Sequence, residues 1–379
     1  MQLYQYLQQL PLSSQDGIDL PPSEKEKALQ MVWQGFLEGD FQQRWEVAKY
    51  LPKFGESVIA RLTQLLQAET VEVDLRCEAA AILGQIKASR ALLALTEMLN
   101  PDTDPEVLTA CSNALTQKGK SAIPILTAAL TNPETRDSAV RALANLRTPE
   151  TIAPLMQVVD DANPEIRRTA VEALSSFRDP QVVSILVKAL QDTHPQVRQE
   201  AVIACGTRGQ DQDPETVVSA LIPLLYDLNL DICGHCAIAL GKLGTATAIQ
   251  ALAKGLNSTL TPFPLQQKII RSLSYQENEQ TLSVLIDSLW RQPLAVQREI
   301  ITIVGRWGDP DSKSLLTTEL MQFFQESPEA QANPSLKQSL ALTLGNLGVI
   351  TAKPLLLHLK EDETPKVRLH AQAALKKLP

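Results

Sequence analysis

Apolar residues recur along this chain with helical spacing, in blocks that repeat about every 31 residues. The clearest blocks begin at Pro164, Pro195 and Pro365, and each has an arginine three residues later and an alanine-rich segment after it. The sequence lacks alternating β-branched runs bounded by hairpin turns, so we expect no strands. A repeat of this length predicts stacked helical hairpins, each of which buries its apolar face only against its neighbours.

Two columns of residues keep one register through eleven blocks, although the spacing between blocks varies from 28 to 40 residues. The first column holds small or aliphatic residues: Val47, Ala79, Cys111, Ala139, Ala170, Ala201, Cys236, Ile269, Ile300, Leu340 and Ala371. The second lies four residues later on the same helical face: Leu51, Leu83, Leu115, Leu143, Leu174, Cys205, Leu240, Leu273, Val304, Leu344 and Leu375. We therefore predict an all-α, right-handed α-solenoid of about eleven helical hairpins, in which both columns are core.

Residues 23–379 are expected to form this array as one elongated domain, and residues 1–22 to form an N-terminal capping segment with a short helix from Leu3 to Leu10. Ser23 and Glu26 have the spacing of a capping box for the first helix. Glycines that end the second helices predict left-handed caps at Gly55, Gly119, Gly209, Gly244, Gly308 and Gly348. The longest block predicts a polar loop over residues 322–333, around Gln325.

Composition excludes several classes of function. The formal net charge is −8 and the pI about 5.2, which argues against nucleic-acid binding. No apolar run is long enough to span a bilayer, and the first residues lack the pattern of a signal peptide. Five cysteines in so long a chain do not indicate a disulfide framework, so we expect a reducing, cytoplasmic location.

The repeat also supports a resemblance to a known family. Several blocks open with Pro-x-Val-Arg or a close variant, and residues 237–244 read Ala-Ile-Ala-Leu-Gly-Lys-Leu-Gly. These features resemble the HEAT-repeat superfamily over roughly residues 24–379. The short period is most similar to the repeats of the phycobilisome-lyase group, found in the E- and F-type subunits of cyanobacterial bilin lyases and in phycobilisome-degradation factors. That resemblance implies a solenoid that binds proteins, with a bilin as a conceivable ligand.

An arginine near the start of many second helices forms a partial ladder: Arg44, Arg76, Arg136, Arg167, Arg198 and Arg368. Acidic residues precede it in several blocks, as at Asp161, Asp192 and Asp362. In HEAT-like arrays such columns bridge adjacent repeats through hydrogen-bonded ion pairs, and we predict the same structural role here. The ladder is interrupted at Leu108, Cys233, Gln266 and Gln297.

The sharpest local motif is Cys233-Gly234-His235-Cys236. A helix N-terminus beside two cysteines can activate a thiol, but the surrounding βαβ pattern of a redox fold is absent. The register already explains Cys236 as a core residue. The sequence favours packing and leaves open a metal or redox site at Cys233, His235 and Cys236, or thiol attachment of a bilin.

No catalytic nucleophile motif or phosphate-binding glycine loop is present, so independent catalysis is not expected. Columns beside the core are predicted to project from the concave side and to bind an acidic protein partner: Arg141, Arg168, Ile203, Ile238, Arg271, Arg298 and Arg306. We predict a non-catalytic interaction scaffold or assembly factor, whose partner the resemblance places in cyanobacterial photosynthetic or cofactor-assembly machinery, such as a phycobiliprotein. The alternatives are a bilin lyase or bilin chaperone, and an iron or iron–sulfur assembly partner.

Overall fold

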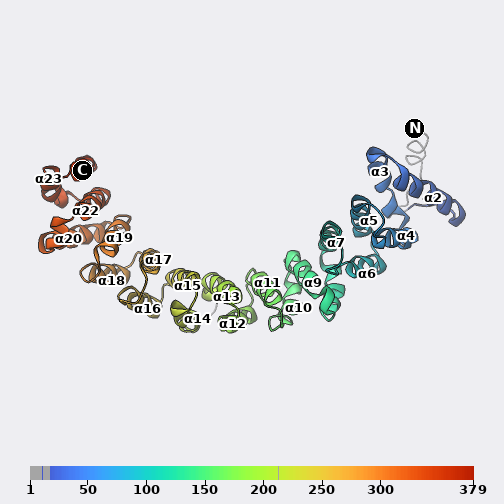
Figure 1. Cartoon of the computed structure of the whole chain (residues 1–379), viewed down its shortest axis with the longest axis horizontal. Coiled ribbons are helices and arrows are strands. Elements are labelled where there is room, and N and C mark those ends of the chain that lie inside the picture. The colour runs from blue at the N-terminus through green and yellow to red at the C-terminus, as the bar shows by residue number, and fades with distance from the viewer. Residues whose placement is uncertain (1–10, 12–17, 212) are drawn as a thin grey trace. The chain divides into compact units, whose positions relative to one another are not determined.

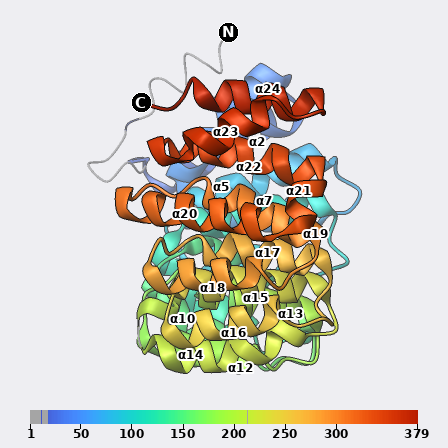
Figure 2. The same ribbon diagram turned by 90° about the vertical axis from the view of Figure 1, so that its left-hand side faces the viewer.

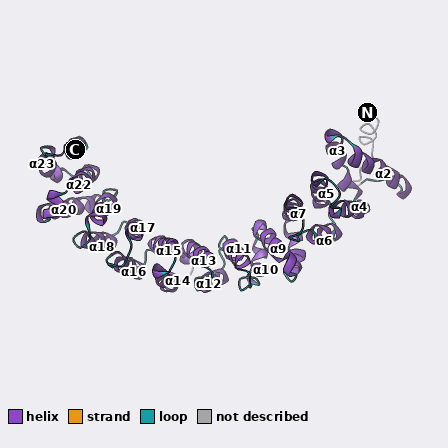
Figure 3. Cartoon of the chain, viewed as in Figure 1, coloured by secondary structure: helices purple, strands orange, loops and turns teal. Residues whose placement is uncertain are grey.

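The computed structural model describes residue 11 and residues 18–211 and 213–379. Every regular element in this part of the chain is helical, as Figure 3 shows. The first helices of the hairpins are α2 (Pro22–Glu38), α4 (Glu56–Gln67), α6 (Ser89–Glu97), α8 (Ile123–Ala129), α10 (Ile152–Met156), α12 (Pro180–Ala189), α14 (Pro214–Leu221), α16 (Ala246–Leu256), α18 (Glu279–Leu289), α20 (Pro310–Glu326) and α23 (Lys353–Lys360).

The second helices are α3 (Phe41–Ala48), α5 (Val73–Gln85), α7 (Pro105–Gln117), α9 (Pro133–Leu146), α11 (Pro164–Leu174), α13 (Pro195–Arg208), α15 (Leu230–Leu243), α17 (Phe263–Leu273), α19 (Leu294–Val304), α22 (Pro334–Leu347) and α24 (Pro365–Leu375). A further short helix, α21 (Pro328–Ala332), lies inside the tenth hairpin. Six 3-10 turns complete the list: η1 (Leu51–Phe54), η2 (Gly119–Ala122), η3 (Pro149–Thr151), η4 (Gly209–Asp211), η5 (Ile222–Tyr226) and η6 (Ile350–Ala352). The prediction of an all-α solenoid with eleven hairpins is confirmed.

The chain divides into two compact units, unit 1 (residues 1–177) and unit 2 (residues 178–379). In unit 1 the second helices α5, α7, α9 and α11 pack on one another in sequence, while α4, α6 and α8 form the other layer. In unit 2 the second helices α13, α15, α17, α19, α22 and α24 do the same, and α14, α16, α18 and α20 lie beneath them. Figure 2 shows the stacked helices of unit 2 from the side.

The two columns read from the sequence form the core. Every member of the first column is at most 2% exposed, and every member of the second is buried except the half-buried Leu375 in the last helix. Each hairpin is therefore closed by its neighbours, as expected for a solenoid.

Glycines with positive φ follow the second helices at three of the six predicted positions, Gly119, Gly244 and Gly348. Gly55 also has a positive φ, but its ψ is −133° and it ends the turn η1 rather than α3. The prediction is wrong at Gly209 and Gly308. At Gly209 the backbone stays right-handed, with φ −62°, and a Cβ would lie only 2.9 Å from Leu243 and from Val217. The glycine is needed there for close packing rather than for a left-handed cap.

Two local predictions are corrected. Helix α2 begins at Pro22 without any side-chain cap, so Ser23 does not start a capping box. Residues 322–333 are not a polar loop around Gln325, because α20 continues to Glu326 and α21 follows it. The helix extends because Phe323 and Phe324 are buried, the first against Trp290 with ring centroids 5.2 Å apart.

The predicted capping segment 1–22 lies mostly outside the described residues, including the expected helix from Leu3 to Leu10. Its described part contacts the array at Ile18, which is 5% exposed and donates its N–H to the Lys53 carbonyl at 3.1 Å. The expectation that residues 23–379 behave as a single domain stays a prediction.

Candidate partner-binding surface

The fourth residue of each second helix occupies one structural position, which we call the ladder position. In unit 1 the Arg76 Nε donates to the Leu66 carbonyl at 2.9 Å. In unit 2 Arg198 and Arg368 donate to the carbonyls of Asp192 and Asp362, at 2.8 and 2.9 Å. These carbonyls lie in or near the end of the first helix of the same hairpin, where backbone acceptors lack helical partners. Arg76, Arg198 and Arg368 therefore tie their second helices to the end of the helix before, whereas the buried Nε of Arg44 has no hydrogen-bond partner among the described residues.

Ladder cations also reach the next hairpin. Arg136 contacts Asp161 at 2.9 Å, and Lys337 contacts Asp362 at 2.6 Å. Arg198 makes two hydrogen bonds to Asp227, of 2.8 and 3.0 Å. The predicted ion pairs between repeats are thus confirmed at these junctions.

The carboxylates in these pairs are strongly held. Burial by itself would raise the pKa of Asp227, but hydrogen bonds from Arg198 and from the Asn229 N–H, together with the guanidinium charge, bring that pKa below its ordinary value. Burial, Lys337 and the Thr364 N–H act in the same way on Asp362, whose pKa is also lowered. Both side chains are ionised at neutral pH and serve as fixed structural charges.

Three successive ladder positions in unit 2 carry uncharged residues instead, and we call Cys233, Gln266 and Gln297 the neutral section. The Cys233 thiol lies 3.2 Å from the Asp227 carbonyl, six residues earlier, as Arg198 and Arg368 reach theirs. Gln266 donates to the Leu256 carbonyl at 3.1 Å, and Gln297 to that of Leu289 at 3.2 Å.

Gln266 also keeps the link to the next hairpin, through a 3.2 Å hydrogen bond to Gln292 Oε1. Gln292 in turn donates to the Leu256 carbonyl and to Asn257. The interruptions at Cys233, Gln266 and Gln297 therefore keep a hydrogen bond to a preceding carbonyl and remove the charge of the ladder.

The Cys233-Gly234-His235-Cys236 motif is part of this packing. The Cys236 thiol donates to the Leu221 carbonyl at 3.0 Å, away from the acceptor of Cys233. Burial raises the pKa of both thiols, and raises that of Cys205 to about 12, which disfavours the reactive thiolate. Among the described residues no group of three or more His, Cys, Asp and Glu could hold a metal ion. Metal binding at Cys233, His235 and Cys236 stays a prediction from the sequence.

The predicted partner-binding arginines fall into two groups. Three are paired with neighbouring carboxylates: Arg141 with Asp137 at 3.0 Å, Arg168 with Glu165 at 3.1 Å and Glu172 at 3.0 Å, and Arg271 with Glu299 at 3.0 Å. These three arginines lie on helix faces whose charge is largely balanced. Arg141 and Arg168 belong to unit 1, and Arg271 belongs to unit 2.

The second group retains its charge. Arg298 is exposed and contacts only the Ser335 hydroxyl, at 3.3 Å, and Arg306 is exposed without any ion pair or hydrogen bond of its side chain to the described residues. Both lie in unit 2, on α19 and in the turn after it. Of the two predicted apolar members, Ile203 is 38% exposed and Ile238 is half-buried.

A set of exposed apolar residues escaped the sequence reasoning. They lie in unit 2, where first helices turn into second helices: Tyr226, Leu228, Leu230, Leu260, Trp290 and Leu294. Leu228 is 104% exposed and Leu260 is 90% exposed. The signal was present as leucines in loops that are polar elsewhere in the chain, but a search directed at the core columns does not register it.

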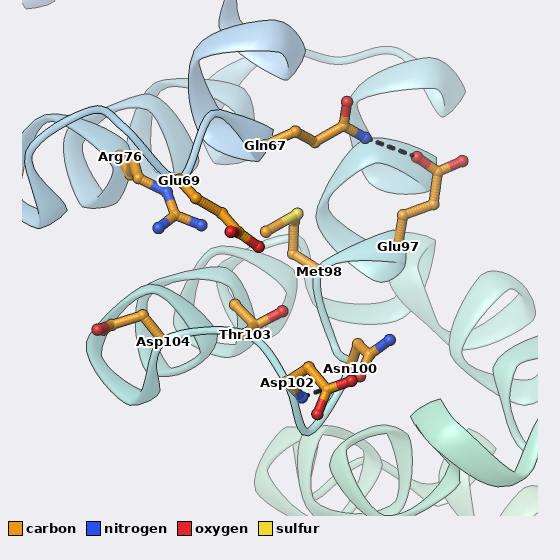
Figure 4. Close-up of a pocket in the computed structure, with 9 residues that line it drawn as sticks. All are labelled: Gln67, Glu69, Arg76, Glu97, Met98, Asn100, Asp102, Thr103 and Asp104. Carbon is orange, nitrogen blue, oxygen red and sulfur yellow. Dashed lines mark hydrogen bonds between the residues drawn. The ribbon is translucent and has the colours of Figure 1, made fainter.

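Unit 1 contains an open cleft of about 500 Å³ where the ladder is incomplete. Figure 4 shows the side chains that line it: Gln67, Glu69, Arg76, Glu97, Met98, Asn100, Asp102, Thr103 and Asp104. Asp102 corresponds to Asp161 of the later hairpin, yet it is exposed and makes no ion pair with a described residue. The cleft is thus an acidic gap at a junction that lacks its bridging pair.

Comparison with known proteins matches these hairpins to a family described as HEAT repeats, at residues 59–139, 123–204 and 183–263. Together the matches cover more than half of the chain. This protein belongs to the HEAT-repeat family. No curated protein matches the HEAT-repeat chain.

Solved structures agree on the fold. The HEAT-repeat chain is similar to a chain from a structure of Kap95p with RanGDP, at 11% identity and a TM-score of 0.60, over 93% of this chain and 55% of that one. It is also similar to a Kap121p variant, at 13% identity and a TM-score of 0.55, over 95% of this chain and 46% of that one. The protein therefore spans about half the length of these two relatives. No helix in the described residues is both long and apolar enough to cross a membrane.

Proposed function

We propose that this HEAT-repeat protein is a non-catalytic scaffold that binds an acidic protein surface through the second helices of unit 2. The observation that carries the proposal is the pair Arg298 and Arg306, two exposed cations without carboxylate partners among the described residues, in a chain of net charge −8. Arg298 lies on α19 and Arg306 in the turn that follows this helix. A partner carboxylate would find both charges available without breaking an existing ion pair.

Exposed apolar groups on the same layer support the proposal. Leu342 on α22 is 43% exposed and Ile203 on α13 is 38% exposed. Apolar contact combined with charge complementarity is typical of interfaces between proteins. Kap95p, which shares the fold, is described in complex with a protein, RanGDP. The sequence resemblance to phycobilisome-lyase-type repeats suggests a partner in cyanobacterial photosynthetic or cofactor-assembly machinery, a setting that rests on the repeat sequence alone.

Affinity capture from native lysate tests the proposal. The wild-type protein is expected to retain a stoichiometric protein partner, and the Arg298→Glu/Arg306→Glu variant to bind the purified partner at least about tenfold more weakly. Lys254→Glu/Lys313→Glu is the matched control, because it reverses two charges on the first helices of the same unit. Equal binding by the two variants, or reproducible recovery of no partner, would overturn the proposal.

A further inference from the structure

Three adjacent turns of unit 2 form one apolar edge, which we define by Leu228, Leu260, Trp290 and Leu294. The first two turns lead into helices α15 and α17, which pack on each other, and Lys268 on α17 approaches Asp231 on α15 at 3.9 Å. Gln292 joins the second pair through its hydrogen bonds to the Leu256 carbonyl and Asn257.

The corresponding turns elsewhere in unit 2 are polar. The turn before α13 reads Gln-Asp-Thr-His over residues 191–194, and the turn before α24 reads Glu-Asp-Glu-Thr over residues 361–364. Isolated exposed leucines are ordinary on a protein surface, whereas apolar groups gathered on successive turns mark an interaction site. Leu228 and Leu260 have almost their whole surface in solvent, so their burial by a partner would be favourable.

Two turns of the apolar edge, that of Leu260 and that of Trp290 and Leu294, belong to the neutral section of the ladder, whereas Leu228 lies beside Asp227. Leu260 occupies the position that Asp227 holds one hairpin earlier, three residues before the start of the second helix, and Cys233 stands where its arginine partner would be. Both members of a bridging ion pair are thus replaced together. At Leu260, Trp290 and Leu294 a partner can cover the edge without removing a guanidinium–carboxylate pair from water, which would oppose binding.

Charge around the edge indicates the chemistry of the occupant. Lys268, Arg291 and Arg298 surround it, and the Arg291 side chain is exposed and makes no ion pair or hydrogen bond with the described residues. The nearby carboxylates are Asp227, which is paired with Arg198, Asp231, opposite Lys268, and Glu299, which is held by Arg271. The surroundings are therefore basic on balance, in contrast to the acidic chain as a whole.

We infer that this apolar edge binds an acidic amphipathic helix of a partner protein. Neighbouring helices in a stack lie about 8–10 Å apart, and seven residues of α-helix rise about 10.5 Å. A helix that crosses the stacked turns therefore presents one apolar side chain per turn when these side chains recur every seventh residue. Carboxylates beside them meet Lys268, Arg291 and Arg298. The inference deepens the proposed function and rests on it, since it names the class of partner and a site beside Arg298.

The test uses the full-length protein and a fluorescent helical peptide of roughly 18 residues, long enough for two seven-residue intervals. The peptide carries leucine at every seventh position, with glutamates flanking each leucine. Saturable binding is expected, with at least about a tenfold loss in Leu228→Ser/Leu260→Ser. The control is Leu315→Ser/Leu357→Ser, which removes two exposed leucines, each 46% exposed, from the first helices α20 and α23. A peptide with lysine in place of glutamate should bind more weakly.

Equal binding by the Leu228→Ser/Leu260→Ser variant and the wild type would overturn the inference. So would preferential binding of the lysine peptide, or binding to vesicles of phosphatidylglycerol and phosphatidylcholine in place of the peptide. Self-association that the Leu228→Ser/Leu260→Ser variant abolishes would assign the edge to a second copy and would also overturn it. If a captured partner needs Arg298 and Arg306 but binds this leucine variant normally, the inference fails and the proposed function stands.

Discussion

The junction between α13 and α15 and the junction between α17 and α19 make the same inter-repeat link with different chemistry. At the first, Arg198 bridges to Asp227 through two charge-assisted hydrogen bonds. At the second, Gln266 bridges to Gln292 through one uncharged hydrogen bond. Arg198 also donates to the Asp192 carbonyl, just after α12, and Gln266 donates to the Leu256 carbonyl at the end of α16. The link between hairpins therefore requires a donor at the ladder position, but not a charge.

The presence or absence of the ladder ion pair affects which side chains the adjacent turn can carry. A buried ion pair is costly to break, because the remaining partner is left unpaired in a medium of low polarity. The turn that contains Asp227 must therefore keep its carboxylate aimed at Arg198. The neutral section has no such requirement, and its turns carry Leu260, Trp290 and Leu294 toward solvent. At these two turns the missing ion pair is accompanied by exposed apolar side chains, whereas Leu228 is exposed beside the charged pair.

The largest effect should come from breaking the charged junction. Arg198→Ala leaves the Asp227 carboxylate buried without its cation, so the free energy of unfolding should fall by about 3 kcal/mol at neutral pH. Gln266→Ala at the neutral junction should cost only about 1 kcal/mol, the scale of an uncharged hydrogen bond. Urea unfolding followed by circular dichroism measures both. Equal losses would show that the two junctions do not differ as described.

A charged pair can be built into the neutral section. Cys233→Arg alone should destabilise the protein, since its guanidinium would lack a carboxylate partner. Adding Leu260→Asp should recover part of the loss, with a coupling energy of about 1 kcal/mol or more in a double-mutant cycle. The double variant should also lose binding of the acidic peptide. Strictly additive effects would mean that these two positions do not face each other.

The charged junction at Asp227 and the neutral junction at Gln292 should also differ in how the free energy of unfolding changes at acid pH. The pKa of folded Asp227 lies below its ordinary value, so ionisation of this group contributes stability that is fully present above the unfolded pKa, about 4. That contribution disappears as the pH falls through the lower, folded pKa. Asp227→Asn should therefore flatten the loss of stability on acidification, whereas Gln292→Ala should keep the wild-type slope. Urea midpoints measured from neutral pH downward test this difference.

The smallest effect belongs to the apolar edge. Leu228→Ser and Leu260→Ser should each change the free energy of unfolding by no more than about 0.5 kcal/mol, because their side chains are almost fully exposed. Leu252→Ala, in the core of the same unit, should cost about 2–5 kcal/mol. A large loss from either serine substitution would give that leucine a structural role and weaken its assignment to a partner.

The sequence was a good guide wherever a residue's role repeats. Both core columns are buried, and the arginine ladder forms ion pairs between hairpins, because each repeat places the same side chain in the same environment. It was a poorer guide at single positions. The αL residue at the end of α9 is Arg147, with φ 47°, and no glycine marks it. Residues around Gln325 read as a polar loop, yet burial of Phe323 and Phe324 extends the helix through them.

The candidate surface shows the same division. The sequence placed Arg271 and Arg298 in columns beside the core and predicted the same partner-binding role for both. Only the folded chain shows that Glu299 pairs with Arg271 while Arg298 meets a serine hydroxyl. Such pairings depend on side chains from different hairpins, which periodicity aligns but does not orient.

The sequence alone determined the all-helical class, the number of hairpins and the residues of the core, because burial in a solenoid is local and repeats with the chain. The tertiary structure decided which charged side chains form ion pairs and which stay exposed without one. It also decided that the neutral ladder residues and the leucines of three separate turns share one edge. These properties arise from contacts between residues about 30 positions apart, a range at which the geometry of neighbouring hairpins sets the outcome.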